Sequence, residues 1–185
     1  MSLKELTKEV HQQAERQDFV KILMSGSINR DLYAIFLYNQ HALYNLLEVC
    51  AMSHGLLNEF KEIRRAPHIL SDFQELWSKE EMPQLTQSTE NYLRHMMTIK
   101  DDPNKLMAHI YVRHMGDLSG GQMIKKKVPG KGSMYEFEGD IKSIKEAIRS
   151  KTDDSMADEA RLCFQYATDL FKELYKIHNA QEKKI

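Results

Sequence analysis

The sequence has 185 residues, of which 42% are hydrophobic and 29% are charged, and its formal net charge is −1. These values are ordinary for one globular domain, and the near-neutral charge gives no sign of a nucleic-acid partner. No apolar run reaches the length of a membrane span, and neither terminus carries a secretory or anchoring segment, so we expect a soluble cytoplasmic protein.

Helical patterns cover nearly the whole sequence, without alternating strand patterns or internal repeats. The first helix opens at a capping box formed by Ser2 and Glu5, and a second capping box is expected at Ser155 and Asp158. The other predicted helices cover, in chain order, 19–24, a long stretch from Asn29 or Asp31 to just before Gly55, 56–65, 69–79, 84–99, about 103–127, 140–151 and about 155–180.

Two features mark boundaries in the second half of the chain. Asp102 with Pro103 predicts the start of the helix over 103–127, because an aspartate cap and a first-turn proline favour a helix N-terminus. Residues 129–139 form the one glycine-rich, loop-like stretch. The pattern therefore predicts an all-α single domain over residues 1–185 with short connections.

The segment Gly-Asp-Leu-Ser-Gly-Gly-Gln at 116–122 places three glycines inside a predicted helix. Each glycine costs about 1 kcal/mol relative to alanine there. Gly116 and Gly120 are four residues apart and share one helix face, with the carboxylate of Asp117 at its edge. Such a face would let the backbone lie against something flat and wide, but glycines in helices more often serve close packing of two helices, a kink or a helix end.

The first helix carries Lys4, Lys8, His11 and Glu15 on one face. A histidine with a carboxylate one turn away can bind a metal, because the carboxylate accepts one imidazole N–H and makes the other nitrogen a better donor. The two lysines could hold an anion. The alternative is a solvent-facing polar stripe with ordinary pairs along the helix.

These segments resemble the heme oxygenases, in particular the soluble bacterial, cyanobacterial or phage-like forms. Residues 7–15 resemble the proximal helix of that family and residues 111–122 resemble its distal helix. The resemblance continues at 145–149 and at 159–171. It implies an all-α, single-domain helical bundle that holds heme between the first, proximal helix and the glycine-containing distal helix.

On the proximal side, the resemblance implies that His11 is the ligand of the heme iron and that Glu15 orients it. Phe164 and Phe171 match aromatic residues of the pocket wall, although plain core packing would explain them equally well. The residues that match positions meeting the heme propionates are Lys4, Lys8, Tyr111, Lys145 and Arg149.

On the distal side, the resemblance implies that Gly116 and Gly120 let the helix backbone press on the heme face. Asp117 would hold the water that delivers protons during the reaction, within a network that Arg113 anchors. The implied activity opens the heme ring with dioxygen and external electrons, giving biliverdin, carbon monoxide and ferrous iron. Heme would be both substrate and cofactor.

The electron donor implied for such a protein is a soluble acidic one, with ferredoxin as the first candidate, and a bilin reductase is a candidate downstream partner. A basic docking face could form from Lys4, Lys8, Lys125, Lys126, Lys127 and Arg149. The alternative for the three consecutive lysines is a solvated helix end, where lysines suit the helix dipole.

Three positions depart from the family pattern. His41 stands where we expect the distal tyrosine, Val112 where a threonine is common, and Ala167 where an asparagine is common. The distal polar network is therefore expected to be partly rebuilt. His109 and His114 are five residues apart, do not share a helix face, and are expected to be structural.

Other classes of function stay open at this point. A heme carrier on the same fold would not need the carboxylate of Asp117. A third alternative is a di-iron oxidase or a thiaminase-like enzyme on a similar helical fold. The di-iron version is disfavoured, because the sequence contains no Glu-x-x-His pair. A helical interaction protein without a site would leave the glycine segment unexplained.

Overall fold

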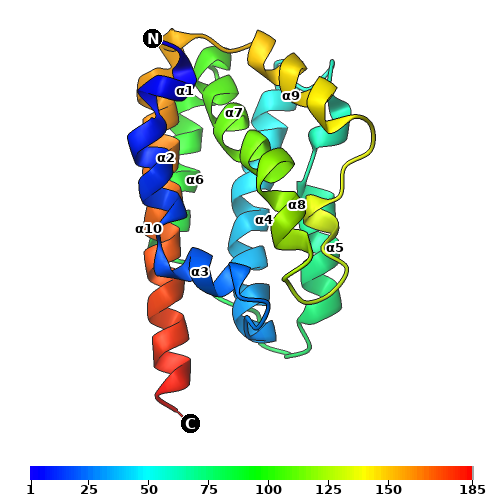
Figure 1. Ribbon diagram of the computed structural model, residues 1–185, viewed down its shortest axis with the longest axis vertical. Helices are drawn as coiled ribbons and strands as arrows, with labels where there is room; N and C mark the ends of the chain where they lie inside the picture. Colours follow the sequence, from blue (N-terminus) through cyan, green and yellow to red (C-terminus); the bar gives the residue numbers. More distant parts are fainter. Residues whose placement is uncertain (185) are drawn as a thin grey trace.

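The computed structural model describes residues 1–184, which contain α-helices, 3-10 turns and no strand, so the predicted all-α class is confirmed. Figure 1 shows the arrangement of the helices. The α-helices are α1 (Leu3–Leu6), α2 (Lys8–Glu15), α3 (Asp18–Met24), α4 (Arg30–Ser53), α5 (Ala66–Leu76), α6 (Gln87–Ile99), α7 (Pro103–Ser119), α8 (Gly121–Lys125), α9 (Ile141–Ser150) and α10 (Ala157–Glu182). The 3-10 turns are η1 (Lys61–Ile63), η2 (Ser133–Tyr135) and η3 (Asp154–Met156).

The two longest helices organise the packing. Helix α4 packs against α5, α6 and α7, and α10 packs against α2, α3, α6 and α7. In Figure 1 the blue α1 and α2 lie along the orange and red α10, with α7 and α4 beside them. Because α2 and α7 both pack on α10, this last helix sets how the first helix faces the glycine-containing one.

Several helix ends agree with the sequence-based prediction because their caps are local. The Ser2 hydroxyl and the Glu5 side chain form the expected capping box of α1. The Asn29 side chain accepts N–H bonds from the first turn of α4, and Asp102 caps α7. The predicted first helix is divided at Thr7, whose hydroxyl donates to the Leu3 carbonyl 2.9 Å away.

The helix predicted over 56–65 is wrong. This stretch forms turns and the short η1, and α5 begins at Ala66. The reason is the buried Glu48 carboxylate, which accepts the backbone N–H groups of Arg65 at 2.6 Å and Ala66 at 2.9 Å. An anion there satisfies N–H groups that a helix start leaves unpaired. Pro67 therefore lies in the first turn of α5 instead of interrupting a helix.

The second predicted capping box, Ser155 with Asp158, is also wrong. Asp153 accepts the Ser155 N–H at 2.9 Å and starts η3, and α10 follows from Ala157 without a side-chain cap. The aspartate two residues before the serine thus replaces the predicted cap.

The loop over 129–139 is held by two buried charged residues. Arg65 donates to the carbonyls of Met134 at 3.1 Å and Glu136 at 2.6 Å, and Asp72 accepts the N–H groups of Ser133 and Met134. These bonds hold the loop against α5, and its η2 turn also packs against α8.

None of the described helices is long and apolar enough to cross a membrane.

Candidate functional site

The glycine segment keeps a helical course through α7 and α8, with Gly120 at the junction (φ −79°, ψ −24°). Gly116, Ser119, Gly120 and Met123 lie on one exposed stripe of this helix pair. A Cβ atom added at Gly116 would meet no atom within 4 Å. The distal helix therefore presents bare backbone to open space.

Gly121 has a different role. A Cβ atom added there would lie 2.5 Å from Cδ1 of the buried Tyr135 ring, which the 129–139 loop holds in place. Gly121 is thus required for helix–loop packing. Gly121 therefore has a packing role, although its neighbour is a loop and not the second helix of the alternative stated for Gly116 and Gly120, whereas Gly116 faces free space.

We expect opposite stability effects of alanine at these two glycines. Gly116→Ala should raise the free energy of unfolding by about 1 kcal/mol, because alanine favours the helix and meets nothing. Gly121→Ala should lower it by about 1–3 kcal/mol, because the Tyr135 ring must move. Urea unfolding of both variants checks this expectation, and equal shifts in the same direction would contradict it.

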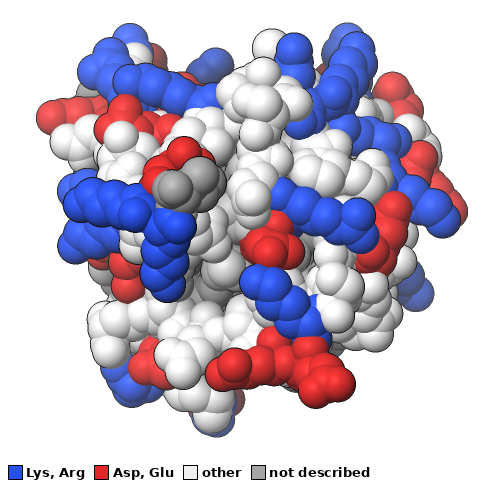
Figure 2. All heavy atoms as spheres, turned by 90° about the horizontal axis from the view of Figure 1, so that it is seen from below, with Lys and Arg blue, Asp and Glu red and all other residues white. Residues whose placement is uncertain are grey.

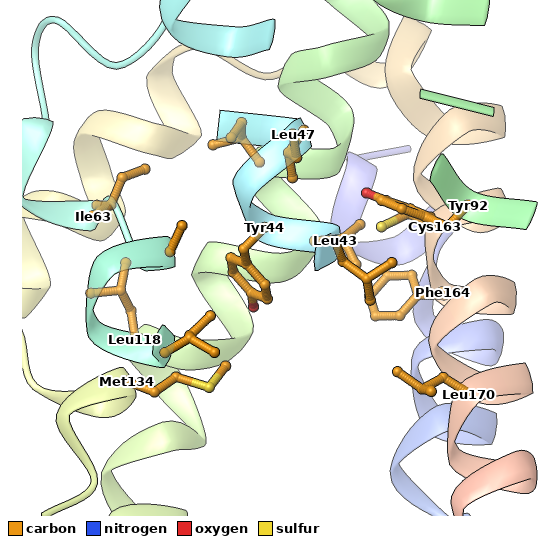
Figure 3. Packing of buried hydrophobic residues seen from close by; sticks show 14 of the residues in the cluster. Leu43, Tyr44, Leu47, Ile63, Tyr92, Leu118, Met134, Cys163, Phe164 and Leu170 are labelled. Atoms are coloured by element: carbon orange, nitrogen blue, oxygen red, sulfur yellow. The ribbon is translucent and has the colours of Figure 1, made fainter. Parts of the chain in front are cut away.

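Asp117 is buried on α7 and accepts a hydrogen bond of 2.6 Å from the hydroxyl of Tyr44 on α4. Burial raises the pKa of Asp117 to about 6, although His114, the Tyr44 bond and two arginines favour the ionised form. A carboxyl group with this pKa can take up or release a proton near neutral pH. In Figure 3, Tyr44 of α4 and Leu118 of α7 lie towards the left of the view. Phe164 and Leu170, both of α10, lie towards the right.

The expectation that His41 replaces the distal tyrosine is wrong. Tyr44, three residues further along α4, places its hydroxyl on Asp117. His41 is half-buried, and burial lowers its pKa. The two positions are less than one helical turn apart, so the sequence pattern alone pointed to the wrong one.

Arg113 completes the buried polar group around Asp117. Its Nε donates to the Tyr92 hydroxyl at 3.1 Å, and its guanidinium lies 4.4 Å from the centre of the Tyr92 ring. Its Nη2 is buried without a partner among residues 1–184, so one donor is left for a bound polar group. Val112 and Ala167 add no hydrogen-bonding side chain, as expected from the sequence.

The proximal candidate His11 lies on α2, with Nε2 2.8 Å from Oε1 of Glu15. Its ring stacks on Phe164 of α10 at 5.0 Å between centroids, and 51% of its side chain is exposed. Phe171 lies about two turns further along α10 and stacks on the buried Phe19 at 5.9 Å between centroids. Phe164 thus supports the histidine ring, whereas Phe171 extends the core towards it.

The cationic candidates lie on α1, α2 and α9. Helix α9 packs on α7 and brings the Arg149 guanidinium near Tyr111, where its charge lowers a tyrosine pKa that burial raises. Like many other cations of the described residues, the four candidates form no ion pair with a carboxylate; they are Lys4, Lys8, Lys145 and Arg149. Unpaired cations of this kind suit an anionic ligand.

Two of the remaining histidines are placed by carboxylates. The buried His114 contacts Glu48 at 2.8 Å, which agrees with the expected structural role. The Nε2 atom of His109 lies 2.8 Å from Glu159, and its Nδ1 atom contacts the Tyr92 hydroxyl that also accepts from Arg113. Neither contact could be predicted from the sequence, because the two carboxylates lie on α4 and α10, far in sequence from these histidines on α7.

The arrangement fits a flat, dianionic ligand with a central metal. Open space lies before the Gly116 backbone, a half-exposed imidazole stacks on an aromatic ring, and unpaired lysines and arginine are available for acidic groups. Heme has this shape and charge. The residues present therefore fit the cofactor that the sequence resemblance implies.

Comparisons with known proteins agree with this fit. The family model described as heme oxygenase matches residues 1–173. Heme oxygenase 2 of Macaca fascicularis is 31% identical over 203 residues, which cover 93% of this chain and 64% of the relative. Heme oxygenase 2 of the cyanobacterium Synechocystis is 30% identical over 178 residues, which cover 84% of this chain and 71% of the relative.

Solved structures give the same result. Heme oxygenase-1 of Synechocystis, solved with heme, matches with a TM-score of 0.84 and 26% identity over 98% of this chain and 96% of that one. Heme oxygenase of Leptospira interrogans matches with a TM-score of 0.82 and 30% identity, over 94% of this chain and 100% of that one. This chain spans 64% of the length of the mammalian heme oxygenase 2 relatives that it matches. Because one family model covers nearly the whole chain and the helices superpose on its solved members, this chain belongs to the heme oxygenase family.

Proposed function

We propose that this chain catalyses the oxidative opening of heme to biliverdin, carbon monoxide and ferrous iron. The observation that carries the proposal is the buried Asp117 carboxyl, bonded to Tyr44 directly beside the bare backbone of Gly116. A carrier needs the bare face and the histidine but has no use for a proton-exchanging carboxyl there. Bound heme would supply the iron that activates dioxygen with electrons from outside.

On the proximal side, we assign His11 as the metal ligand and Glu15 as the group that orients it. The carboxylate accepts the N–H of one ring nitrogen and thereby keeps the other unprotonated for iron. Phe164 supports the ring, and Phe171 continues the apolar wall. The cationic and phenolic groups assigned to the propionates are Lys4, Lys8, Tyr111, Lys145 and Arg149.

On the distal side, Gly116 and Gly120 let the helix backbone approach the macrocycle, because a glycine has no Cβ atom to stand between the backbone and the ring. Asp117 holds a water molecule and exchanges protons with it, which its pKa of about 6 allows near neutral pH. The Tyr44 hydroxyl donates to the carboxylate and orients it. Arg113 keeps a free Nη2 donor beside this pair.

A single optical experiment tests the proposal. Hemin is added to the protein, followed by ascorbate or reduced ferredoxin in air, and the absorption spectrum is recorded over time. We expect the Soret band to disappear while a biliverdin band grows. A Soret band that forms and persists under both reductants would instead identify a heme carrier on the same fold.

The electron donor that we propose is a soluble acidic protein, with ferredoxin as the first candidate. Lys126 and Lys127 are exposed at the end of α8, while Lys125 is paired with Glu136 at 3.1 Å. Figure 2 shows that on the face seen from below, lysine and arginine side chains alternate with acidic ones instead of forming one large patch. Docking would therefore rest on a few local charges, together with Lys4, Lys8 and Arg149.

We expect ferredoxin-supported turnover to fall as ionic strength rises, while ascorbate-supported turnover stays nearly constant. Salt screens charge attraction with a Debye length of about 10 Å at 0.1 M. The double variant with Lys126→Glu and Lys127→Glu should reproduce the loss at low salt, and Lys172→Glu on α10 is the matched control. Equal salt dependence with both reductants would rule out the docking face.

Three further predictions stay untested. These are the single-domain organisation of residues 1–185, of which residue 185 lies outside the described part, the cytoplasmic location, and a bilin reductase as the partner that takes up the product.

A further inference from the structure

Three helices bring His95, His109 and Glu159 together at a point that the proposed heme chemistry does not use. His95 comes from α6, His109 from α7 and Glu159 from α10. The Nε2 atoms of both histidines contact the same carboxylate oxygen, Oε1 of Glu159, with a distance of 2.8 Å for His109. The possible ligand atoms of all three residues lie within 4.8 Å of one another.

His109 is held through its Nδ1 atom in the way that metal-binding histidines are held. Its other ring nitrogen, Nδ1, lies 2.8 Å from the Tyr92 hydroxyl, whose oxygen accepts the Nε–H of Arg113. A histidine that binds a metal through Nε2 typically donates its Nδ1–H to a fixed oxygen. Tyr92 offers that oxygen, so His109 is already oriented with Nε2 towards Glu159.

Burial and charge also favour a cation at this point. The His109 side chain is fully buried, whereas Glu159 and His95 are 12% and 18% exposed, so an ion could reach the cluster from the His95 side. The Glu159 carboxylate places a negative charge beside both Nε2 atoms, which favours a bound cation there.

We propose that His95, His109 and Glu159 bind a divalent transition-metal ion of the Fe²⁺, Co²⁺ and Zn²⁺ series. Two neutral imidazoles and one carboxylate match the preference of these ions, whereas Mg²⁺ and Ca²⁺ prefer oxygen ligands alone. Ligand atoms about 3.3 Å apart are needed for bonds of about 2.0 Å in a tetrahedral site. The partly exposed His95 is the side chain with room to make this adjustment.

A metal titration of the heme-free full-length protein tests the site. After dialysis against a chelator, Co²⁺ is added and its visible d–d absorption is followed, and Zn²⁺ is then used to displace it. We expect a single tight Co²⁺ per chain. His95→Gln and Glu159→Gln should each weaken binding at least about tenfold. His68→Gln, at an exposed histidine on α5, and His11→Gln, which removes the His11–Glu15 pair on α2, should leave the tight binding unchanged.

Thermal unfolding in the presence of metal gives a second measurement. Zn²⁺ should raise the Tm of the parent protein and of both control variants but not that of His95→Gln, and Mg²⁺ should raise none. If Glu159→Gln loses its helical circular dichroism, the partly exposed His95→Gln decides the question. Absence of Co²⁺ and Zn²⁺ binding, unchanged affinity in His95→Gln, or loss of binding in His11→Gln would each overturn the proposal. The last two would leave the contacts among the three residues as hydrogen bonds alone.

Discussion

Replacement of His11 by alanine should abolish heme ring opening while hemin binding is largely retained. Burial of the apolar macrocycle provides much of the affinity, at roughly 25 cal/mol per Å², so the loss of one axial ligand leaves most of it. Turnover depends on the ligand itself, because the iron must keep one fixed protein ligand and one open position. The measurements are a hemin titration, the spectrum of the reduced complex and the rate of biliverdin formation.

Two comparisons make this test specific. Added imidazole should restore part of the turnover of His11→Ala, because removal of the His11 ring leaves space over the Phe164 ring on which it stacks. Glu15→Gln should keep the ligand and reduce turnover by on the order of tenfold. His68→Ala, on the exposed face of α5, should behave as the parent protein. Full ring-opening activity in His11→Ala with an unchanged reduced spectrum would show that another residue binds the iron.

Asp117→Asn should lower the rate of ring opening by at least about 100-fold, the usual contribution of a positioned proton donor or acceptor. The amide keeps the shape of the side chain and can still accept the Tyr44 hydroxyl, but it cannot exchange a proton. Hemin binding should therefore be preserved. In the parent protein the rate should fall as pH drops through about 6, where the carboxylate becomes protonated. The measurement is biliverdin yield across a pH series.

The same substitution should stabilise the fold at alkaline pH. The pKa of Asp117 is raised from 3.8 to about 6, so the folded state holds this proton more tightly than the unfolded state. Ionised Asp117 therefore costs roughly 3 kcal/mol of stability above pH 6, and the cost disappears as pH falls from 6 towards 4. Asp117→Asn should unfold at higher temperature than the parent at pH 8, with the difference shrinking at pH 5. A lower Tm at pH 8 would contradict this account, and Asp158→Asn, at a fully exposed carboxylate, is the control.

Local signals in the sequence were sufficient for much of the fold. Ser2, Asn29 and Asp102 cap helices through N–H groups within three residues, and the structure contains the expected start at each of them. The family was identified from the resemblance of this glycine segment together with residues 7–15, because the glycines alone left close helix packing, a kink or a helix end open. Such features depend only on residues close in sequence.

The sequence-based predictions failed where a distant group decides local structure. The stretch 56–65 is amphipathic enough for a helix, but the Glu48 carboxylate binds the N–H groups of Arg65 and Ala66 and starts the helix there instead. Tyr44 could have been recognised from its position near His41 on the long helix. Only the fold shows which of the two reaches Asp117.

The sequence by itself therefore determined the helical class, most helix boundaries, the family and the candidate residues on the two helices proposed to enclose the heme. The tertiary structure decided which glycine faces open space and which meets Tyr135, which tyrosine supports Asp117, and that His95, His109 and Glu159 converge. Caps and helix faces arise from bonds over a few residues, so they are visible in the sequence. Contacts between side chains from three helices depend on how α6, α7 and α10 pack, because residues 50 or more positions apart become neighbours only after the core has formed.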